Sequence, residues 1–267
     1  MGLPGTSSNK AKIARRVIEV LDYFDEDHRE ATVMDIVRRY DRPQSSTSEL
    51  LSSLVELGLL SKDPYSRAYR LTARAAMLGV SGQPRMLADG SLARLLDRLV
   101  AQTGLSVGLF SMVGLDCQII SWRRGRRPSA TLNADMLSGI KAPLTRGAPG
   151  WLLLSAFTRS RLDGMIRRLN AEAPETEKFV QSEMLARIEE CAARGHALGP
   201  AGFGPEVGAI AMPLPADCAA EPLVVAIIHD TGENVNADTL LRCIAEGIDQ
   251  CLGQPRQGTI EAFPNAA

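Results

Sequence analysis

The 267-residue chain is poor in the side chains that most enzymes use for catalysis. It has three histidines and five cysteines, and no two cysteines have the C-x-x-C spacing of a zinc knuckle or a redox motif. The odd number and wide spacing of the cysteines also argue against a disulfide framework. No serine nucleophile elbow, metal-binding pair or carboxylate pair stands out. We therefore expect no enzymatic activity, no metal and no cofactor.

Long apolar runs and an excess of one charge are also lacking. No run of about 18 apolar residues could span a bilayer. The first residues do not combine a basic segment with an apolar stretch, as a secretory signal would. These features predict a cytoplasmic protein that does not bind membranes. Lys and Arg together number 30 against 31 Asp and Glu, so any surface that binds a polyanion has to be local.

The length is sufficient for two domains, and the first 75 residues have a clear pattern. Apolar residues recur at helical spacing in three segments, about 12–24, about 32–40, and from Pro43 to Leu57. Thr32 and Asp35 have the spacing of a weak capping box for the second helix. Two short strand-like runs, 59–62 and 68–71, follow and are separated by turn residues. Three helices and a hairpin in this order predict a winged helix-turn-helix at residues 10–75.

In such a domain the third helix can enter a major groove, and the hairpin can touch the neighbouring backbone. Basic residues before this helix and on the hairpin are candidates for phosphate contacts: Arg38, Arg39, Arg42 and Arg67. Short polar residues at the start of the helix are candidates for contacts with base edges and phosphates: Gln44, Ser45, Ser46, Thr47 and Ser48. Alternatively, Ser45 or Ser46 caps the helix, with Ser46–Glu49 as a capping box. For Arg15 and Arg16, a position on a solvated helix face is as good an interpretation as a contact with phosphates.

The remainder of the chain predicts an α+β domain at 91–255. A linker at 76–90 precedes it, and a flexible tail at 256–267 follows. Strand-like runs at 106–112, 117–122, 207–213 and 223–229 are separated from helical segments at 92–100, 147–157, 159–170, 179–194 and 237–252. Because strands and helices segregate rather than alternate, the class is α+β.

Three ordered segments carry a resemblance to a known family. The first runs from Ser46-Thr47 through Leu50-Leu51 to Leu57-Gly58. The second combines Ala142-Pro143-Leu144 with Gly150 and Leu152–Leu154. The third comprises Arg194-Gly195-His196, 208–214 and 224–228. In this order and spacing the chain resembles the isocitrate lyase regulator (IclR-type) family of bacterial transcription factors. The resemblance implies a double-stranded DNA operator as partner, a dimer or tetramer of the chain, and a linker helix. It also implies a GAF-like effector domain whose mixed sheet holds a small, often carboxylate-bearing metabolite.

The resemblance also implies which residues line the effector pocket: Ala148, Pro149, Gly150, Gly199, Val207, Ala209, Ile227 and His229. The helix start at Ala148 would anchor an anion, because backbone N–H groups and the helix dipole favour one there. The apolar character of most of these residues favours a hydrophobic acid, an aromatic compound or a lactone. His229 could instead have a purely structural role.

Two features depart from or lie outside this pattern. Glu49 stands in the third helix where the family usually has arginine, and phosphates repel a carboxylate unless it accepts a hydrogen bond from a cytosine amine. A sensor or scaffold that no longer binds DNA is therefore the alternative function. The basic segment 123–127 could bind an anionic partner, or it could be an exposed turn after a strand.

Overall fold

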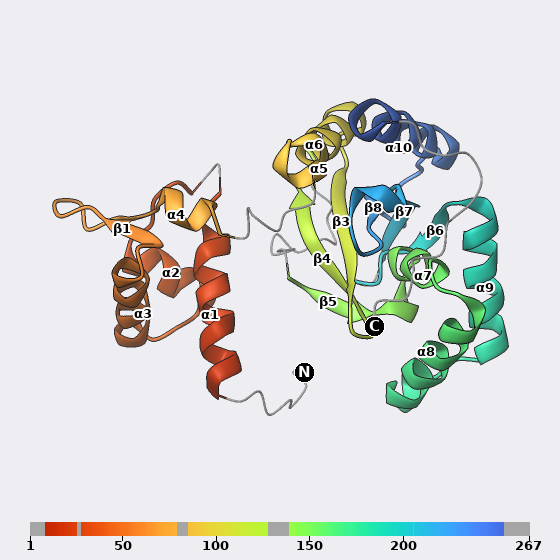
Figure 1. Cartoon of the computed structure of the whole chain (residues 1–267), viewed down its shortest axis with the longest axis horizontal. Helices are drawn as coiled ribbons and strands as arrows, with labels where there is room; N and C mark the ends of the chain where they lie inside the picture. The colour runs from red at the N-terminus through yellow and green to blue at the C-terminus, as the bar shows by residue number, and fades with distance from the viewer. Residues whose placement is uncertain (1–8, 26–27, 79–84, 128–138, 205, 254–267) are drawn as a thin grey trace. The chain divides into compact units, whose positions relative to one another are not determined.

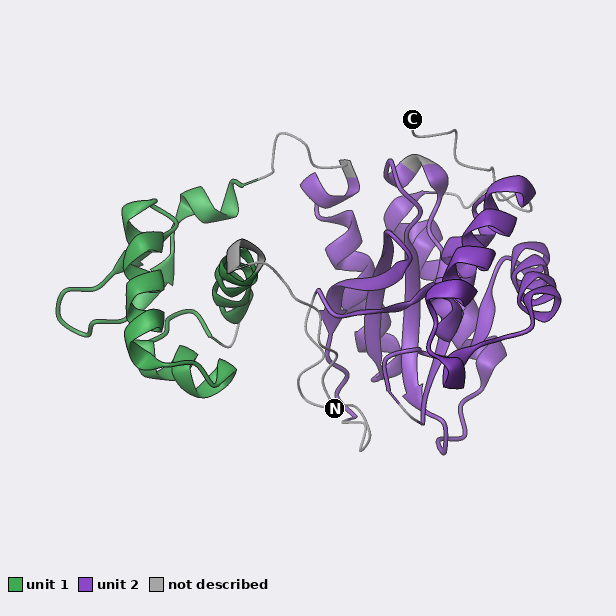
Figure 2. Ribbon diagram, turned by 90° about the horizontal axis from the view of Figure 1, so that it is seen from below, with its two compact units in different colours: residues 1–82 green, residues 83–267 purple. Residues whose placement is uncertain are grey.

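The computed structural model describes residues 9–25, 28–78, 85–127, 139–204 and 206–253. The chain divides into two compact units, residues 1–82 (unit 1) and 83–267 (unit 2) (Figure 2). The division lies within the 76–90 segment interpreted as a linker. None of the described helices is both long and apolar enough to cross a membrane.

Unit 1 has the predicted order of three helices and a hairpin (Figure 1). Its elements are α1 (Asn9–Tyr23), α2 (Val33–Tyr40), α3 (Gln44–Glu56), β1 (Leu60–Lys62), β2 (Tyr69–Leu71) and the short α4 (Ala73–Ala76). The capping box of α2 is confirmed, because Thr32 Oγ1 accepts from Asp35 N while Asp35 Oδ2 accepts from Thr32 N. The helices and the hairpin enclose one apolar core that includes Ile36, Leu51 and Tyr69.

Unit 2 is built on one six-stranded sheet with the strand order β5-β4-β3-β8-β7-β6. The strands are β3 (Ser106–Val113), β4 (Asp116–Arg123), β5 (Lys141–Pro143), β6 (Ala197–Pro200), β7 (Val207–Pro213) and β8 (Val224–Asp230). Every ladder is antiparallel, so the α+β class is confirmed but the mixed sheet is wrong. The helical stretch between β5 and β6 joins strands at opposite edges of the sheet. It therefore never acts as the crossover that parallel neighbours need.

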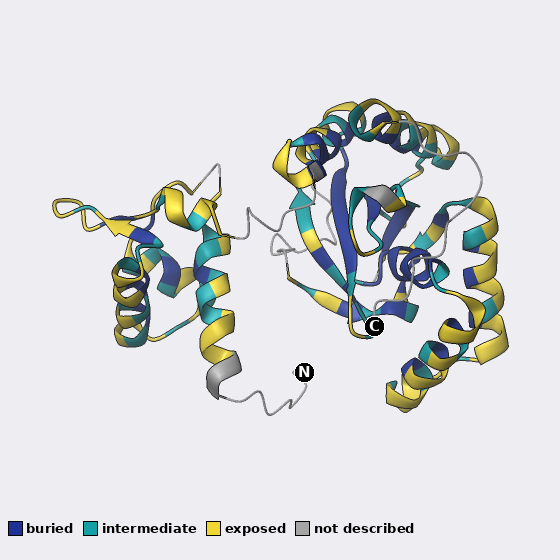
Figure 3. Cartoon of the chain, in the orientation of Figure 1, coloured by how far each residue is buried: buried dark blue, intermediate teal, exposed yellow. Residues whose placement is uncertain are grey.

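Helices cover both faces of this sheet, so both faces are buried (Figure 3). One face is covered by α7 (Ala148–Ser155), against which α9 (Gln181–Arg194) packs, and α8 (Arg159–Glu172) packs against α9. The other packs against α6 (Ser91–Thr103) and α10 (Ala237–Leu252). Side chains alternate between the faces along each strand. In β8, for example, Ala226 and Ile228 face α7, whereas Val225 and Ile227 face α6 and α10.

The longer elements and the hairpin strands β1 and β2 lie within a few residues of their predicted positions, whereas four other short elements were not predicted. The sequence pattern did not predict α4, β5, β6 and α5 (Arg85–Ala88). Each has only three or four residues, too few to show a periodic pattern. Short 3-10 helices η2 (Leu144–Arg146) and η3 (Glu175–Glu177) flank α7 and α8. The predicted tail, 256–267, lies outside the described residues.

Candidate functional site

Fewer of the polar residues predicted to contact DNA are exposed on α3 than the sequence indicated. Gln44, Ser45 and Glu49 are exposed, and Ser48 is half-buried. Thr47 is only 1% exposed, and its hydroxyl donates to the carbonyl oxygen of Pro43 at 2.9 Å. Its side chain therefore belongs to the core of unit 1 and does not reach a base edge in this structure.

Ser46 connects α3 to α1. Its Oγ accepts a hydrogen bond from Arg16 Nη2 at 2.9 Å and donates to Pro43 O at 3.2 Å. The N-cap of α3 is Pro43, which offers no side-chain hydrogen bond, so the Ser46–Glu49 capping box is absent. Arg16 thus brings a guanidinium to the first turn of a helix that has no basic residue of its own. Sequence spacing could not show this, because the contact joins residues 30 positions apart.

The predicted phosphate contacts differ in how accessible they are. Arg38 and Arg39 are exposed in the last turn of α2. Arg42, in contrast, is half-buried, and its Nη2 lies 3.2 Å from both carboxylate oxygens of Glu19. Its charge is therefore already neutralised within unit 1, and Arg42 is a poor candidate for a phosphate contact.

The loop between β1 and β2, called the wing here (residues 63–68), is held by one carboxylate. Asp63 Oδ1 accepts from the backbone N–H groups of Tyr65 and Ser66, each at 2.8 Å, and these bonds lower the pKa of Asp63. Arg67 adopts a positive φ of 59° and is exposed. Tyr65 at the tip is 94% exposed. The wing therefore presents one aromatic and one basic side chain to solvent.

The residues expected to line the effector pocket do not all lie on one face of the sheet in unit 2. Ala148, Val207 and Ala209 belong to the buried cluster on the α7 face. Ile227 lies in the cluster on the α6 and α10 face. His229 shares that face, because it follows Ile227 by two residues in β8, and its Nδ1 lies 2.9 Å from the carbonyl oxygen of Asp230. A single pocket on the α7 face therefore excludes Ile227 and His229.

The start of α7 is covered by the loop that follows β6. Ala148, Pro149 and Gly150 are all buried. A Cβ atom added to Gly147 would lie 2.6 Å from Pro200 O and 2.7 Å from Ala201 O, so these carbonyls pack directly on the helix start. Gly199 packs against the ring of Trp151, 2.8 Å from the position of a Cβ. The expected anion anchor at this helix start is closed to solvent in this structure.

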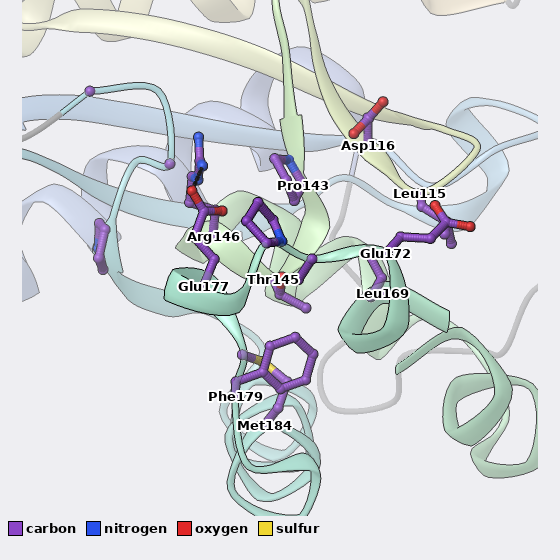
Figure 4. A pocket seen from close by; sticks show the side chains of 15 residues that line it. Leu115, Asp116, Pro143, Thr145, Arg146, Leu169, Glu172, Glu177, Phe179 and Met184 are labelled. Atoms are coloured by element: carbon purple, nitrogen blue, oxygen red, sulfur yellow. Dashed lines mark hydrogen bonds and ion pairs between the residues drawn. The ribbon is translucent and has the colours of Figure 1, made fainter. Parts of the chain in front are cut away.

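A cavity of about 650 Å³ lies beside this covered helix start (Figure 4). The β3–β4 turn, η2, the end of α8, η3, α9 and the loop after β6 line it. Its charged lining residues are Asp116, Arg146, Glu172 and Glu177. The guanidinium of Arg146 forms an ion pair with the carboxylate of Glu177. None of the eight predicted effector residues lines this cavity, and no spacing in the sequence pointed to it.

The family model of the IclR helix-turn-helix domain matches residues 14–64, which span α1 to β1. A comparison with curated proteins gives no match. Among solved structures, the chain is similar to an IclR homolog from Microbacterium hydrocarbonoxydans complexed with 4-hydroxybenzoate. The identity is 18% and the TM-score 0.58, over 90% of this chain and 98% of that one.

Two further structures show the same fold. The IclR of Thermotoga maritima is 17% identical with a TM-score of 0.58, over 91% of this chain and 99% of that one. A transcriptional regulator from Alicyclobacillus acidocaldarius is 19% identical with a TM-score of 0.57, over 97% and 100% of the two chains. The similarity thus covers both units.

Proposed function

We propose that this protein is a transcriptional regulator, because the model of the IclR helix-turn-helix domain matches residues 14–64 and the chain is similar in fold to IclR-family structures. It binds operator DNA through α3 and the wing, and a small hydrophobic or aromatic acid-like metabolite modulates its affinity for that DNA. The helix-turn-helix match at residues 14–64 carries the proposal. The half-exposed or exposed polar residues of α3 and the solvent-facing wing support it.

Charge supplies the main argument for the alternative, a scaffold without DNA binding. Glu49 and Glu56 place two exposed carboxylates on α3, where phosphates would repel them. Arg16 brings a cation to the start of α3, where it donates to Ser46, and Arg38 of α2 and Arg67 of the wing are exposed cations elsewhere in unit 1. Contacts of this kind provide most of the affinity of a DNA-binding protein and make it depend on salt. We therefore favour DNA binding over the scaffold function.

The deciding experiment is fluorescence anisotropy of the full chain with labelled DNA from upstream of its own gene. Over a salt series we expect log affinity to fall linearly with log salt, with tighter binding than to scrambled DNA. Adding 4-hydroxybenzoate to the same samples should change the affinity, because a ligand shifts a protein toward the state that it binds better. Absence of binding at low salt, with and without the acid, would favour the scaffold.

The proposal that an aromatic acid is the effector rests on the apolar lining of unit 2 and on one similar structure. The α7 face of the sheet is apolar and includes Phe110, whose ring is tilted by 31° against that of Phe203 with the centroids 5.6 Å apart. The similar Microbacterium structure holds an aromatic acid. These observations support an aromatic acid as the ligand class for this chain. The assembly of the chain into a homodimer or tetramer stays a prediction.

Arg16 provides a second test of DNA binding. Replacing Arg16 with alanine should weaken binding to all DNA sequences by a similar factor and reduce the salt slope by about one, because one phosphate contact is lost. Arg15→Ala is the matched control, since Arg15 is the neighbouring exposed arginine of α1, and it should change both quantities less. Anisotropy titrations at several salt concentrations measure both. Equal effects of the two substitutions would contradict a specific role for Arg16.

A further inference from the structure

Among the described residues that line the cavity beside α7, Arg146 has the one basic side chain. Arg146 ends η2, directly before Gly147, and its side chain is 47% exposed. A planar guanidinium of this kind can bind a carboxylate through two parallel hydrogen bonds. This gives the cavity one anchor for an organic acid.

That anchor already holds a carboxylate from the protein itself. Glu177 of η3 forms an ion pair with Arg146, and the hydrogen bond from the guanidinium lowers the pKa of Glu177. The Glu177 side chain is 40% exposed, and an ion pair as open to water as this contributes little stability. A carboxylate from solution can therefore compete for Arg146 at small cost to the fold.

The other acidic residues of the cavity do not block such a ligand. Glu172 accepts from Arg168 Nε at 2.7 Å, so its charge is compensated on α8. Asp116 is the first residue of β4 and lies on the opposite side of the cavity from Arg146 (Figure 4). Electrostatic repulsion of an acid bound at Arg146 is therefore weak.

The rest of the cavity suits an apolar or aromatic body. The Phe179 ring and the Met184 side chain lie together below Glu177, and Leu169 contributes from α8 (Figure 4). Thioether and aromatic groups provide adaptable, polarisable contacts for a ring. One cation beside an apolar wall is the arrangement that recognises a small hydrophobic acid.

We propose that an aromatic acid binds in this cavity with its carboxylate on Arg146, and that Glu177 is an internal competitor which the ligand displaces. This inference rests on the proposed effector-binding function and moves its site away from the closed start of α7. Displacement releases η3, the short turn between α8 and α9, from its contact with η2. Binding is then coupled to the connection between these two helices.

Isothermal titration calorimetry of the full chain with 4-hydroxybenzoate tests the proposal. Arg146→Gln should weaken binding by about 10- to 100-fold, because a charge-assisted hydrogen bond is lost. Glu177→Gln should instead tighten binding by about 3- to 10-fold, because the competing charge is removed. The central expectation is that the two substitutions change the affinity in opposite directions. If the ion pair had only a structural role, both substitutions would weaken binding.

Two controls complete the experiment. Glu175→Gln changes the other carboxylate of η3, which does not line the cavity, and should leave the affinity unchanged. The neutral analogue 4-hydroxybenzyl alcohol should bind the wild type at least roughly 10-fold more weakly than the acid and be insensitive to Arg146→Gln. Tryptophan fluorescence monitors folding and binding together, because Trp151 Nε1 donates to the carbonyl oxygen of Thr145, a cavity residue.

The possible outcomes distinguish an error in the proposed binding site from an error in the proposed function. If 4-hydroxybenzoate binds the wild type and Arg146→Gln equally well, the site assignment is overturned while effector binding stands. If both Arg146→Gln and Glu177→Gln weaken binding, the displacement of Glu177 is overturned. If the wild type binds none of 4-hydroxybenzoate, benzoate and phenylacetate at millimolar concentrations, the cavity does not recognise aromatic acids. DNA binding, measured separately by anisotropy, is untouched by all three results.

Discussion

Replacing Glu49 with glutamine should change the preferred base at one position of each operator half-site from cytosine to adenine. A carboxylate in the major groove can only accept hydrogen bonds, and the cytosine N4 amine is its usual partner. A glutamine amide pairs in a bidentate manner with the N6 and N7 atoms of adenine. A good pair of this kind discriminates against a wrong base by about 1–3 kcal/mol, or roughly 5- to 150-fold in affinity.

Glu49 is singled out because most of its neighbours on α3 are already engaged. Thr47 is buried, and Ser46 is bonded to Arg16 and Pro43. The hydroxyl groups of Ser52 and Ser53 donate to carbonyl oxygens one turn back in the same helix, at 2.9 and 3.0 Å. Within the described part of unit 1, the carboxylate of Glu49 has neither an ion pair nor a hydrogen bond. Recognition helices use such residues near their start to contact bases.

Selection from randomised double-stranded DNA, followed by sequencing, measures this preference even when the operator is unknown. Glu49→Gln should enrich adenine, and Glu49→Arg should enrich guanine, at the position where the wild type enriches cytosine. Glu56→Gln is the matched control, because Glu56 is also exposed but ends α3, and its preferred sequence should equal that of the wild type. If the wild type enriches a sequence that Glu49→Gln leaves unchanged, Glu49 does not read a base. If only Glu49→Arg binds DNA, the scaffold function is favoured.

The helix-turn-helix unit was predictable from sequence because its elements are periodic and local. Helical spacing of apolar residues located α1 to α3. Which polar residues of α3 face solvent was harder to predict. Thr47 and Ser48 are adjacent in sequence, yet the first is buried and the second is half-buried. Arg42 and Arg16 find their partners in α1 and α3 across the unit, and such long-range contacts leave no pattern in a single sequence.

The effector site was harder to predict, for two physical reasons. Alternation along β8 predicts that Ile227 and His229 share a face, but it does not say which face meets α7. Which face of β8 meets α7 depends on the side of the sheet to which the chain crosses after β5. The second reason is that the cavity is assembled from loop and turn residues of several elements. Arg146 and Glu177 are separated by 31 residues, and each by itself looks like an ordinary surface charge.

Gly150 shows how a residue expected at a ligand site can have a packing role instead. A Cβ atom added to Gly150 would lie 2.1 Å from the backbone carbonyl oxygen of Leu144 and 2.7 Å from its carbonyl carbon. These atoms belong to the backbone of η2 and are fixed by the hydrogen bond from Leu144 N to Leu115 O. A side chain at position 150 would therefore push η2 away from α7, whether or not a ligand is bound.

Gly150→Ala should destabilise unit 2 by about 3 kcal/mol, because an overpacked core cannot relax without a backbone shift. In a domain of this size that lowers Tm by roughly 6–12 °C. Gly164→Ala is the matched control. Gly164 is exposed within α8, and its added Cβ would meet nothing within 4 Å. Alanine there should stabilise the helix by roughly 0.5–1 kcal/mol.

Thermal unfolding followed by tryptophan fluorescence reports on unit 2 alone, because both tryptophans of the chain, Trp122 and Trp151, lie in it. Opposite shifts of Tm for two glycine-to-alanine substitutions, in α7 and in α8, would separate steric packing from the general effect of helix propensity. A rise in Tm for Gly150→Ala would mean that η2 and α7 can separate readily. The cavity beside them, with Arg146 at its edge, would then be a flexible opening and not a preformed site.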